Sequence, residues 1–344
     1  MEHKFPYKWF LKDGFPAKGI EKHNLKVFGT FICGGGSSFG YKLAGYNHLG
    51  GVEIDKQIAP IYKLNHNPKY LYNEDIRDFR VREDLPEELF ELDILDGSPP
   101  CSVFSIAGKR EEGWGVEKTF REGQAKQSLD DLFFEYIALA KRLQPKVVIA
   151  ENVKGMLIGN AKIYCKKIKE AFIDAGYEVQ LFLLNAATMG VPQKRERVFF
   201  VARRKDLKWP ELKLCFNEKP IVFSEISDEG DKILKVNTEG ADLWKICKQG
   251  RDFSSVAKNK NSYFSYKKMA DNETPCTIVA AQGSCSWHST IQRLLNKNEL
   301  CQIGSYPLDY NFGTLQPKYL IGMSVPPVVM AQLSHQIYLQ WFKK

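Results

Sequence analysis

The sequence predicts an α/β fold with a doubly wound, mostly parallel sheet and a second, smaller irregular domain. Apolar stretches typical of strands alternate with segments of helical spacing up to about residue 204. These stretches are apolar throughout, as in strands that are covered on both faces. Beyond residue 205 the alternation stops, and Lys, Asn, Ser and aromatic residues dominate an irregular region that extends to about residue 290.

The individual elements follow an N-terminal extension, residues 1–24. Each is bounded by glycine, proline or a polar cluster, which punctuate secondary structure. Strands are expected at 25–32, 49–55, 91–97, 146–153, 178–186 and 197–204. Helices are expected from the glycine loop to Gly45, within 127–145, within 161–177 and at 326–342. Pro145 and Gly176 are the residues that end the second and third of them. The last helix has an apolar face that we expect to pack back on the first domain.

Composition narrows the class of protein. The net charge is +8 with a pI of about 8.9, which favours an acidic partner. No apolar stretch is long enough to span a bilayer and the N-terminus has no apolar signal core, so we expect a cytoplasmic protein. The eight cysteines form no Cys-x-x-Cys pair, which argues against a metal site, and we expect no disulfide framework.

A glycine loop follows the first expected strand, in the order strand, "CGGGSSFG", helix. Glycines allow a ligand to approach the backbone, and a helix N-terminus favours negative charge. Glu53 ends the next strand, where doubly wound folds place an acid on ribose hydroxyls. The loop is not a clean G-x-G-x-x-G, and a tight structural turn explains it equally well. If the loop binds a ligand, both NAD and S-adenosylmethionine fit.

Cys101 stands on a stiff turn after the expected strand 91–97. Pro99 and Pro100 cut that strand short at the carboxyl edge of the sheet, where such folds bind ligands. Most cysteines are buried and inert, but the neighbours of Cys101 are turn-forming and small polar residues. The sequence therefore favours a nucleophile held in place by a rigid turn.

Two further segments bring charge to the same edge. The apolar strand 146–150 leads into Glu151, which is either a structural cap or ion-pair member, or a general acid. Arg195 and Arg197 alternate with other charges, so we expect both on one face of the incoming strand. They form either a solvated charged edge or an arginine pair for a phosphate or a base oxygen.

Taken in order, these motifs resemble those of the cytosine-C5 DNA methyltransferases of the bacterial restriction-modification type. The matching segments are "FICGGGSSFG", "VEID", "SPPCSVFS", "AENV" and "GVPQKRERVFFV", with "RLLNKNELCQIGSYPLDYNF" and "YLIGMSVPPVVMAQ" near the end. The resemblance covers nearly the whole chain from residue 25. It implies a Rossmann-like methyltransferase fold, a catalytic and cofactor-binding domain at 25–204, a target-recognition domain at 205–316, and a segment 317–344 that returns to the catalytic domain.

The resemblance also implies residue roles. Cys101 would attack C6 of a flipped cytosine, Glu151 would hold or protonate N3, and Arg197 would contact the base, with Arg195 and Gln193 in support. S-adenosylmethionine would be the methyl donor, leaving S-adenosylhomocysteine. The residues carried over to the cofactor are Phe31, Gly34, Gly35, Gly36, Glu53, Ile54, Asp75, Ile76, Pro100 and Ser324.

The partner implied by the resemblance is double-stranded DNA, bound by a monomer that acts independently of any cognate restriction endonuclease. A loop after Cys101 would close over the DNA, and a piece around residue 282 would read bases in the major groove. The residues expected at the DNA are Ser102, Ser105, Lys109, Arg110, Gln282, Ser284 and Ser286.

Three positions depart from the family pattern. Cys33 replaces a glycine of the loop, Met323 replaces an asparagine near the C-terminus, and "SLDDLFFEY" lacks the usual arginine. None is a group that performs the chemistry, so activity is expected. The alternatives are a transfer-RNA cytosine-5 methyltransferase of the same superfamily, a nicotinamide dehydrogenase, which leaves Cys101 and Glu151 idle, and a non-catalytic DNA-binding protein.

Overall fold

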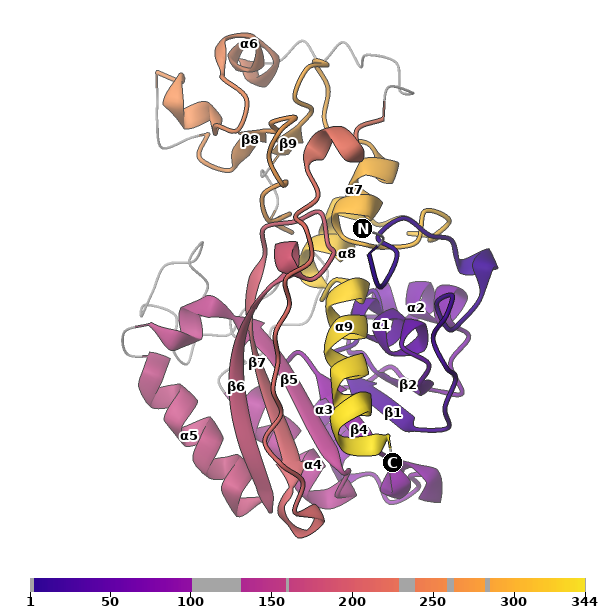
Figure 1. Cartoon of the computed structure of the whole chain (residues 1–344). Coiled ribbons are helices and arrows are strands. Elements are labelled where there is room, and N and C mark those ends of the chain that lie inside the picture. Colours follow the sequence, from indigo (N-terminus) through magenta and orange to yellow (C-terminus); the bar gives the residue numbers. More distant parts are fainter. Residues whose placement is uncertain are drawn as a thin grey trace. The chain divides into compact units, whose positions relative to one another are not determined.

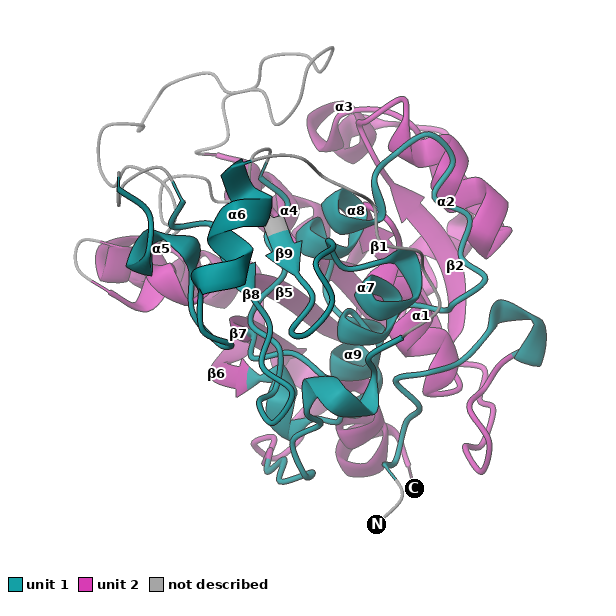
Figure 2. Cartoon of the chain, turned by 90° about the horizontal axis from the view of Figure 1, so that it is seen from above, with its two compact units in different colours: residues 1–14, 185–195, 215–332 teal, residues 15–184, 196–214, 333–344 magenta. Residues whose placement is uncertain are grey.

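The computed structural model describes residues 3–100, 131–158, 161–228, 239–258, 263–281 and 285–343. The chain forms two compact units, which are coloured separately in Figure 2. Unit 1 comprises residues 1–14, 185–195 and 215–332, and unit 2 comprises residues 15–184, 196–214 and 333–344. Each unit is therefore assembled from segments that lie far apart in the sequence.

Unit 2 is built on a seven-stranded sheet with the strand order β3-β2-β1-β4-β5-β7-β6. Its strands are β1 (Lys26–Thr30), β2 (Asn47–Val52), β3 (Tyr70–Tyr72), β4 (Ile94–Gly97), β5 (Val147–Val153), β6 (Tyr177–Asn185) and β7 (Glu196–Arg204). The strands from β3 to β5 pair in parallel, whereas β7 is antiparallel to β5. The predicted doubly wound, mostly parallel sheet is confirmed.

Helices cover both faces of this sheet (Figure 1). The helices of unit 2 are α1 (Gly36–Leu43), α2 (Ile58–His66), α3 (Ile76–Val81), α4 (Leu132–Leu143) and α5 (Ala161–Asp174). Side chains of α3, α4 and α5 form one apolar core with the strands, which explains why the strands are apolar throughout. The other face carries α1 and α2 (Figure 1). The chain order reverses between β1 and β4, and the carboxyl ends of strands at such a switch are where these folds bind ligands.

The C-terminal helix α9 (Pro327–Ile337) continues as a π-helical turn (Tyr338–Phe342). From residue 333 onward this segment belongs to unit 2. The Tyr46 hydroxyl donates to the Ser334 carbonyl at 2.8 Å, and the Trp341 indole donates to the Pro210 carbonyl at 2.9 Å. No helix among the described residues is both long enough and apolar enough to cross a membrane.

Unit 1 holds the remaining regular elements, among them a two-stranded parallel ribbon. They are α6 (Glu239–Ile246), β8 (Tyr266–Lys268), β9 (Cys285–Trp287), α7 (Lys297–Ile303) and α8 (Pro317–Met323). Part of the N-terminal extension folds here too, since the Trp9 indole donates to the Ser305 carbonyl at 3.0 Å. The Leu11 amide donates to Asp309 Oδ1 at 2.6 Å. Single 3₁₀ turns occur in both units, at Leu11–Asp13, Glu87–Glu91, Lys154–Leu157, Ala186–Thr188, Lys205–Leu207, Phe223–Glu225 and Phe253–Ser255.

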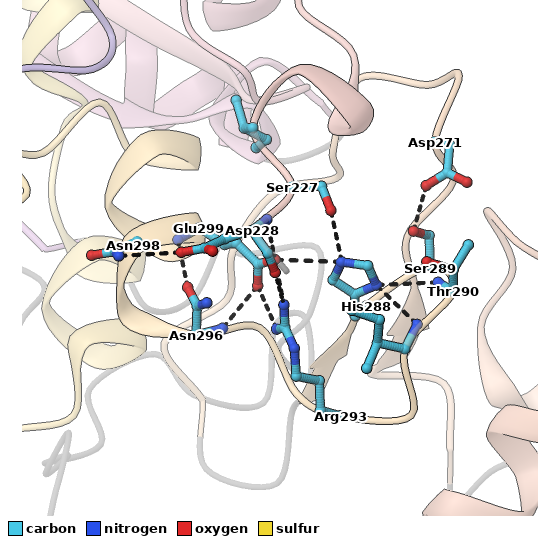
Figure 3. Close-up of polar contacts among 12 residues, drawn as sticks. Ser227, Asp228, Asp271, His288, Ser289, Thr290, Arg293, Asn296, Asn298 and Glu299 are labelled. Atoms are coloured by element: carbon cyan, nitrogen blue, oxygen red, sulfur yellow. Dashed lines mark hydrogen bonds and ion pairs between the residues drawn. The ribbon is translucent and has the colours of Figure 1, made fainter. Parts of the chain in front are cut away.

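A buried polar network holds the start of α7 in unit 1 (Figure 3). Arg293 Nη1 and Nη2 each donate to a carboxylate oxygen of Glu299 at 2.8 Å, and both side chains are buried. Nδ1 of His288 accepts from the Thr290 and Ile291 amides, so its proton lies on Nε2, which donates to Ser227 Oγ at 2.8 Å. The buried guanidinium and the buried carboxylate of this network therefore compensate each other.

Candidate active site

The candidate site of unit 2 is assembled from the carboxyl ends of neighbouring strands. Phe31 follows β1 directly, Glu53 follows β2, and Pro100 lies three residues beyond β4. Glu151 lies within β5, one residue past the last pairing of that strand with β4. Because β1 to β5 are parallel, these residues share one edge of the sheet.

The loop between β1 and α1 has an unusual backbone. Phe31 and Cys33 take left-handed conformations, with φ of 53° and 47°, and Gly35 has a φ of 78°. A Cβ on Gly35 would lie 2.0 Å from Nε2 of His66, so only glycine fits there. Cys33 adopts a conformation natural for the glycine it replaces. Such strain is tolerated chiefly at ligand-binding loops.

Glu53 is tied to that loop. Its Oε2 accepts from the Cys33 amide at 2.8 Å, and its Oε1 accepts from the Asp55 amide at 2.9 Å. The side chain is buried, and the two amides fix its orientation. Carboxylate oxygens accept hydrogen bonds from hydroxyl groups, so an oriented carboxylate at this position suits a ligand that carries hydroxyl donors.

Asp75 is the second predicted cofactor acid, and it caps α3. Its Oδ1 accepts from the Arg77 amide at 2.8 Å, and its Oδ2 pairs with the Arg77 guanidinium at 3.0 Å. Ile76 is buried and Ile54 is half-buried. Since β2 and β3 are parallel neighbours, Glu53 and Asp75 follow adjacent strand ends at the same edge. Two acceptor carboxylates and a strained glycine loop together fit an S-adenosyl ligand, whose ribose hydroxyls and amino group are donors.

Glu151 and Arg197 form an ion pair in unit 2, with 3.0 Å between Oε1 and Nε. In the antiparallel pairing of β5 with β7, Arg197 stands opposite Val153 and Glu151 stands opposite Phe199. The two side chains are therefore diagonal neighbours on one face of the sheet. Both remain partly exposed, at 11% for Glu151 and 19% for Arg197, so a ligand can reach them. A carboxyl and a guanidinium side by side can recognise a ring nitrogen and an adjacent oxygen.

The turn after β4 is anchored up to its prolines. The buried Asn152 amide donates to the Pro99 carbonyl at 3.0 Å, which ties the turn to β5. Pro100 is half-buried. The predicted nucleophile Cys101 lies outside the described residues, as do the DNA-contact candidates Ser102, Ser105, Lys109, Arg110, Gln282 and Ser284.

Gln193 and Arg195 belong to unit 1 and are both buried. Gln193 donates to the Ile303 carbonyl at 2.9 Å and accepts from the Ile278 amide at 3.2 Å. Arg195 donates through both terminal nitrogens to the Gly322 carbonyl at 3.2 Å. The prediction that both arginines share a strand face is wrong, because β7 begins at Glu196 and Arg195 precedes it.

Two serines predicted at ligands also lie in unit 1. The Ser324 hydroxyl is buried and donates to the Leu320 carbonyl at 2.8 Å, one turn back along α8. Ser286 is the central residue of β9, opposite Lys267 of β8, and is half-buried. Met323, where the family pattern has asparagine, is exposed.

Two residues near the site were missed by sequence reasoning, Asp96 in β4 and Tyr41 in α1. Both are buried, and the Tyr41 hydroxyl donates to Asp96 Oδ1 at 3.2 Å. The available signal was an acid inside an otherwise apolar strand, since such a residue needs a partner or a function.

Comparison with known proteins gives consistent matches. A family model described as C-5 cytosine-specific DNA methylase matches residues 25–339. The type II methyltransferase M.FnuDI of Fusobacterium nucleatum is 39% identical over 183 residues, 53% of this chain and 48% of that protein. M.NgoPII of Neisseria gonorrhoeae, also a type II methyltransferase, is 36% identical over 56% of this chain and 51% of its own. The chain thus spans about half the length of these two relatives.

Solved structures show the same fold at low identity. A protein encoded within a prophage of E. coli superposes with a TM-score of 0.69 and 19% identity, covering 93% of this chain and 100% of that chain. A mutant of Spodoptera frugiperda DNMT2 gives a TM-score of 0.64 and 19% identity, covering 92% and 100%. These likenesses support the predicted Rossmann-like architecture.

Proposed function

Because this chain belongs to the C-5 cytosine-specific DNA methylase family, we propose that it is a DNA (cytosine-5-)-methyltransferase. The observation that carries the proposal is the Glu151–Arg197 ion pair, at the sheet edge where the turn to Cys101 begins. This edge supplies an acid and a guanidinium, and the turn anchored there at Pro99 precedes Cys101 by two residues in the sequence. Hydride transfer by a nicotinamide dehydrogenase would assign no role to Glu151, Arg197 or Cys101.

In the proposed reaction the Cys101 thiolate attacks C6 of cytosine, forming the Sγ–C6 bond, while Glu151 holds or protonates N3. Arg197 contacts the base. Attack at C6 turns C5 into an enamine carbon that can accept a methyl group. Once C5 carries the methyl group, its proton passes to water, the electrons of the C5–H bond form the C5=C6 double bond, and the thiolate leaves C6. N3 gives any proton it received back to Glu151, and the aromatic ring is restored. C5 is inaccessible in a stacked duplex, so the base must be flipped out.

S-adenosylmethionine would supply the methyl group when bound, and S-adenosylhomocysteine would remain. The proposed cofactor residues are Phe31, Gly34, Gly35, Gly36, Glu53, Ile54, Asp75, Ile76, Pro100 and Ser324. Glu53 would accept from ribose hydroxyls, for which its two backbone contacts preset the carboxylate. Asp75 would accept from an amino group.

The remaining predicted residues support binding and orientation. Gln193 and Arg195 would hold the backbone of unit 1, in keeping with their contacts to Ile303 and Gly322. The DNA contacts are proposed at Ser102, Ser105, Lys109, Arg110, Gln282, Ser284 and Ser286. Residues 25–204 would then serve catalysis, residues 205–316 target recognition, and residues 317–344 a return to the catalytic domain.

We further propose that the protein acts as a monomer on double-stranded DNA in the cytoplasm. A cognate restriction endonuclease would act independently on the same short site. The names of M.FnuDI and M.NgoPII as type II methyltransferases, together with the basic net charge, support this assignment.

Base-resolution methylation sequencing tests the proposal. DNA and RNA from cells that express the wild type or Cys101→Ala are compared with those from cells without the gene. We expect 5-methylcytosine at one short duplex motif with the wild type alone. Methylation confined to RNA would favour the transfer-RNA activity, and no new 5-methylcytosine in either polymer would overturn the proposal.

A further inference from the structure

Asp96 is a carboxyl group buried inside the sheet of unit 2. It lies in β4, where it pairs in register with Gly29 of β1 and Ile149 of β5. Only 5% of the residue is exposed. A lone acid in a central strand is expensive for the fold, and such a group usually persists because it does something.

The partners of Asp96 are hydroxyl groups from one face of α1. The Tyr41 hydroxyl donates to its Oδ1 at 3.2 Å, and Ser37, one turn earlier, also forms a hydrogen bond with its side chain. The Thr30 hydroxyl donates to its backbone carbonyl at 3.2 Å. Asp96 thus joins β4 to the helix that follows the cofactor loop.

This link connects two parts of the proposed site, the loop that would bind the cofactor and the turn that precedes Cys101. On one side, α1 begins at Gly36, so a shift of the helix moves the glycine loop. On the other side, β4 ends at Gly97, and the chain leads through Pro99 and Pro100 to Cys101, the next residue in the sequence. Asn152 fixes the same turn from β5, through the Pro99 carbonyl. Asp96 therefore links the strand that leads to the Cys101 turn with the helix that follows the cofactor loop.

The electrostatic surroundings of Asp96 oppose its charge. Burial raises its pKa to about 7, the Tyr41 and Ser37 hydroxyls counteract the rise, and the Glu151 carboxylate adds to it. The titratable groups facing it are Tyr41 on α1, Tyr62 on α2, Tyr136 on α4 and Glu151 on β5. Among the described residues, no cation contributes to its shift. Within the described ranges, the groups that donate to the Asp96 carboxylate are the Tyr41 and Ser37 hydroxyls.

We propose that Asp96 is a positioning residue for methyl transfer, which couples the cofactor loop to the turn of Cys101 most firmly when its carboxyl is ionised. The inference rests on the proposed function. Hydrogen bonds to an ionised acceptor are stronger than those to a neutral one, so ionisation of Asp96 strengthens its hydrogen bonds to α1. The same ionisation places an unpaired charge in the core and weakens the fold.

The test compares wild type, Asp96→Asn and Asp93→Asn at about pH 6 and about pH 8.5, on either side of the Asp96 titration. Asn keeps the shape of Asp96 but cannot ionise. Asp93 is a matched control on the same chain segment, since it is buried and paired with Lys146 at 2.7 Å before β4 begins. Binding of S-adenosylhomocysteine is measured by calorimetry, and stability by the midpoint of urea unfolding.

For the wild type we expect affinity for S-adenosylhomocysteine to rise about fivefold from the lower to the higher pH. Asp96→Asn should bind with the weaker affinity at both, yet unfold at higher urea than wild type at the higher pH. Asp93→Asn should unfold at lower urea and retain the pH-dependent affinity. The readout that a purely structural role would not move is the pH dependence of the affinity, which Asp96→Asn should lose.

Three outcomes would overturn the inference. One is an Asp96→Asn variant that keeps the wild-type pH dependence of binding. Another is a variant that loses stability and affinity together. The third is a wild type that binds S-adenosylhomocysteine at neither pH, and this result would overturn the proposed function as well. The first two leave the proposed function standing, so the two failures are distinguishable.

Discussion

Two buried carboxyl groups, Glu299 in unit 1 and Asp96 in unit 2, have opposite electrostatic surroundings. Glu299 accepts two hydrogen bonds from the Arg293 guanidinium and one from the Asn296 backbone amide, and the His288 imidazole lies 3.5 Å away. Asp96 accepts hydrogen bonds from the Tyr41 and Ser37 hydroxyls, and the Glu151 carboxylate opposes its charge. Removing one partner of a buried ion pair destabilises the fold, because the other charge is left uncompensated. A buried acid with a raised pKa is instead typical of functional sites. The difference predicts opposite responses when each acid is neutralised.

The largest effect is expected at the paired acid. Glu299→Gln leaves the buried Arg293 without its carboxylate partner, and we expect a loss of about 3–5 kcal/mol in the free energy of unfolding. Urea unfolding measures it. The double variant Arg293→Met with Glu299→Leu removes both charges and should cost much less. Equal losses in the single and double variants would show that the charges do not interact.

Neutralising Asp96, for which the described residues provide no cation, should stabilise the protein. The pKa of Asp96 is about 7 in the folded protein, whereas in the unfolded chain it returns to the ordinary aspartate value of 3.8. Its contribution to stability is therefore present below about pH 4 and is lost as the pH rises through 7. Asp96→Asn should remove this loss and gain up to about 4 kcal/mol at high pH. A pH-independent difference between the two proteins would contradict this description of Asp96.

The hydroxyl of Tyr41 should matter more when Asp96 is ionised. Tyr41→Phe removes a donor to Asp96, which we expect to cost about 2 kcal/mol above pH 8 and about 1 kcal/mol near pH 5. Tyr62→Phe is the matched control, because its hydroxyl donates to the neutral Ser38 at 3.0 Å. Its cost should be the same at both pH values. Equal pH dependence in the two variants would mean that the charge of Asp96 is not what Tyr41 stabilises.

The smallest effect concerns left-handed backbone, which occurs in both units but with side chains that have different roles. Cys33→Gly relieves a left-handed backbone and keeps the amide that Glu53 accepts, so we expect a gain of about 0.5–1 kcal/mol. Ser305→Gly relieves similar strain in unit 1 but deletes the hydroxyl that accepts from the Val328 amide. It should give no gain. Thermal unfolding of both variants decides whether Cys33 is strained by the site.

The central strands were predictable because burial on both faces makes them apolar throughout. The expected strand 146–153 differs from β5 (Val147–Val153) by one residue, and the expected strand 197–204 differs from β7 by one. The short elements α2, β3 and α3 were missed, since three to nine residues carry too little periodicity to be recognised. The pairing of β7 antiparallel to β5 depends on tertiary contacts, which no local pattern encodes.

At the site, the order of motifs predicted the candidate residues, but not the contacts that hold them. The pairing of Glu151 with Arg197 depends on the diagonal register of β5 and β7, which the sequence does not specify. The burial of Arg195 against the Gly322 carbonyl joins residues 127 positions apart. Asp96 was visible as an acid in an apolar strand, yet its partners Ser37 and Tyr41 lie on a helix whose packing only the structure reveals.

Covalent trapping tests the central claim most directly. Duplex DNA carrying 5-fluorocytosine at the methylated position is incubated with the protein and S-adenosylmethionine, and the adduct is mapped by peptide mass spectrometry. Fluorine at C5 cannot leave as a proton does, so the Sγ–C6 bond should persist and the adduct should map to Cys101. Cys101→Ala should form none. An adduct on another residue, an adduct with Cys101→Ala, or no adduct with a duplex that the wild type methylates would contradict the account.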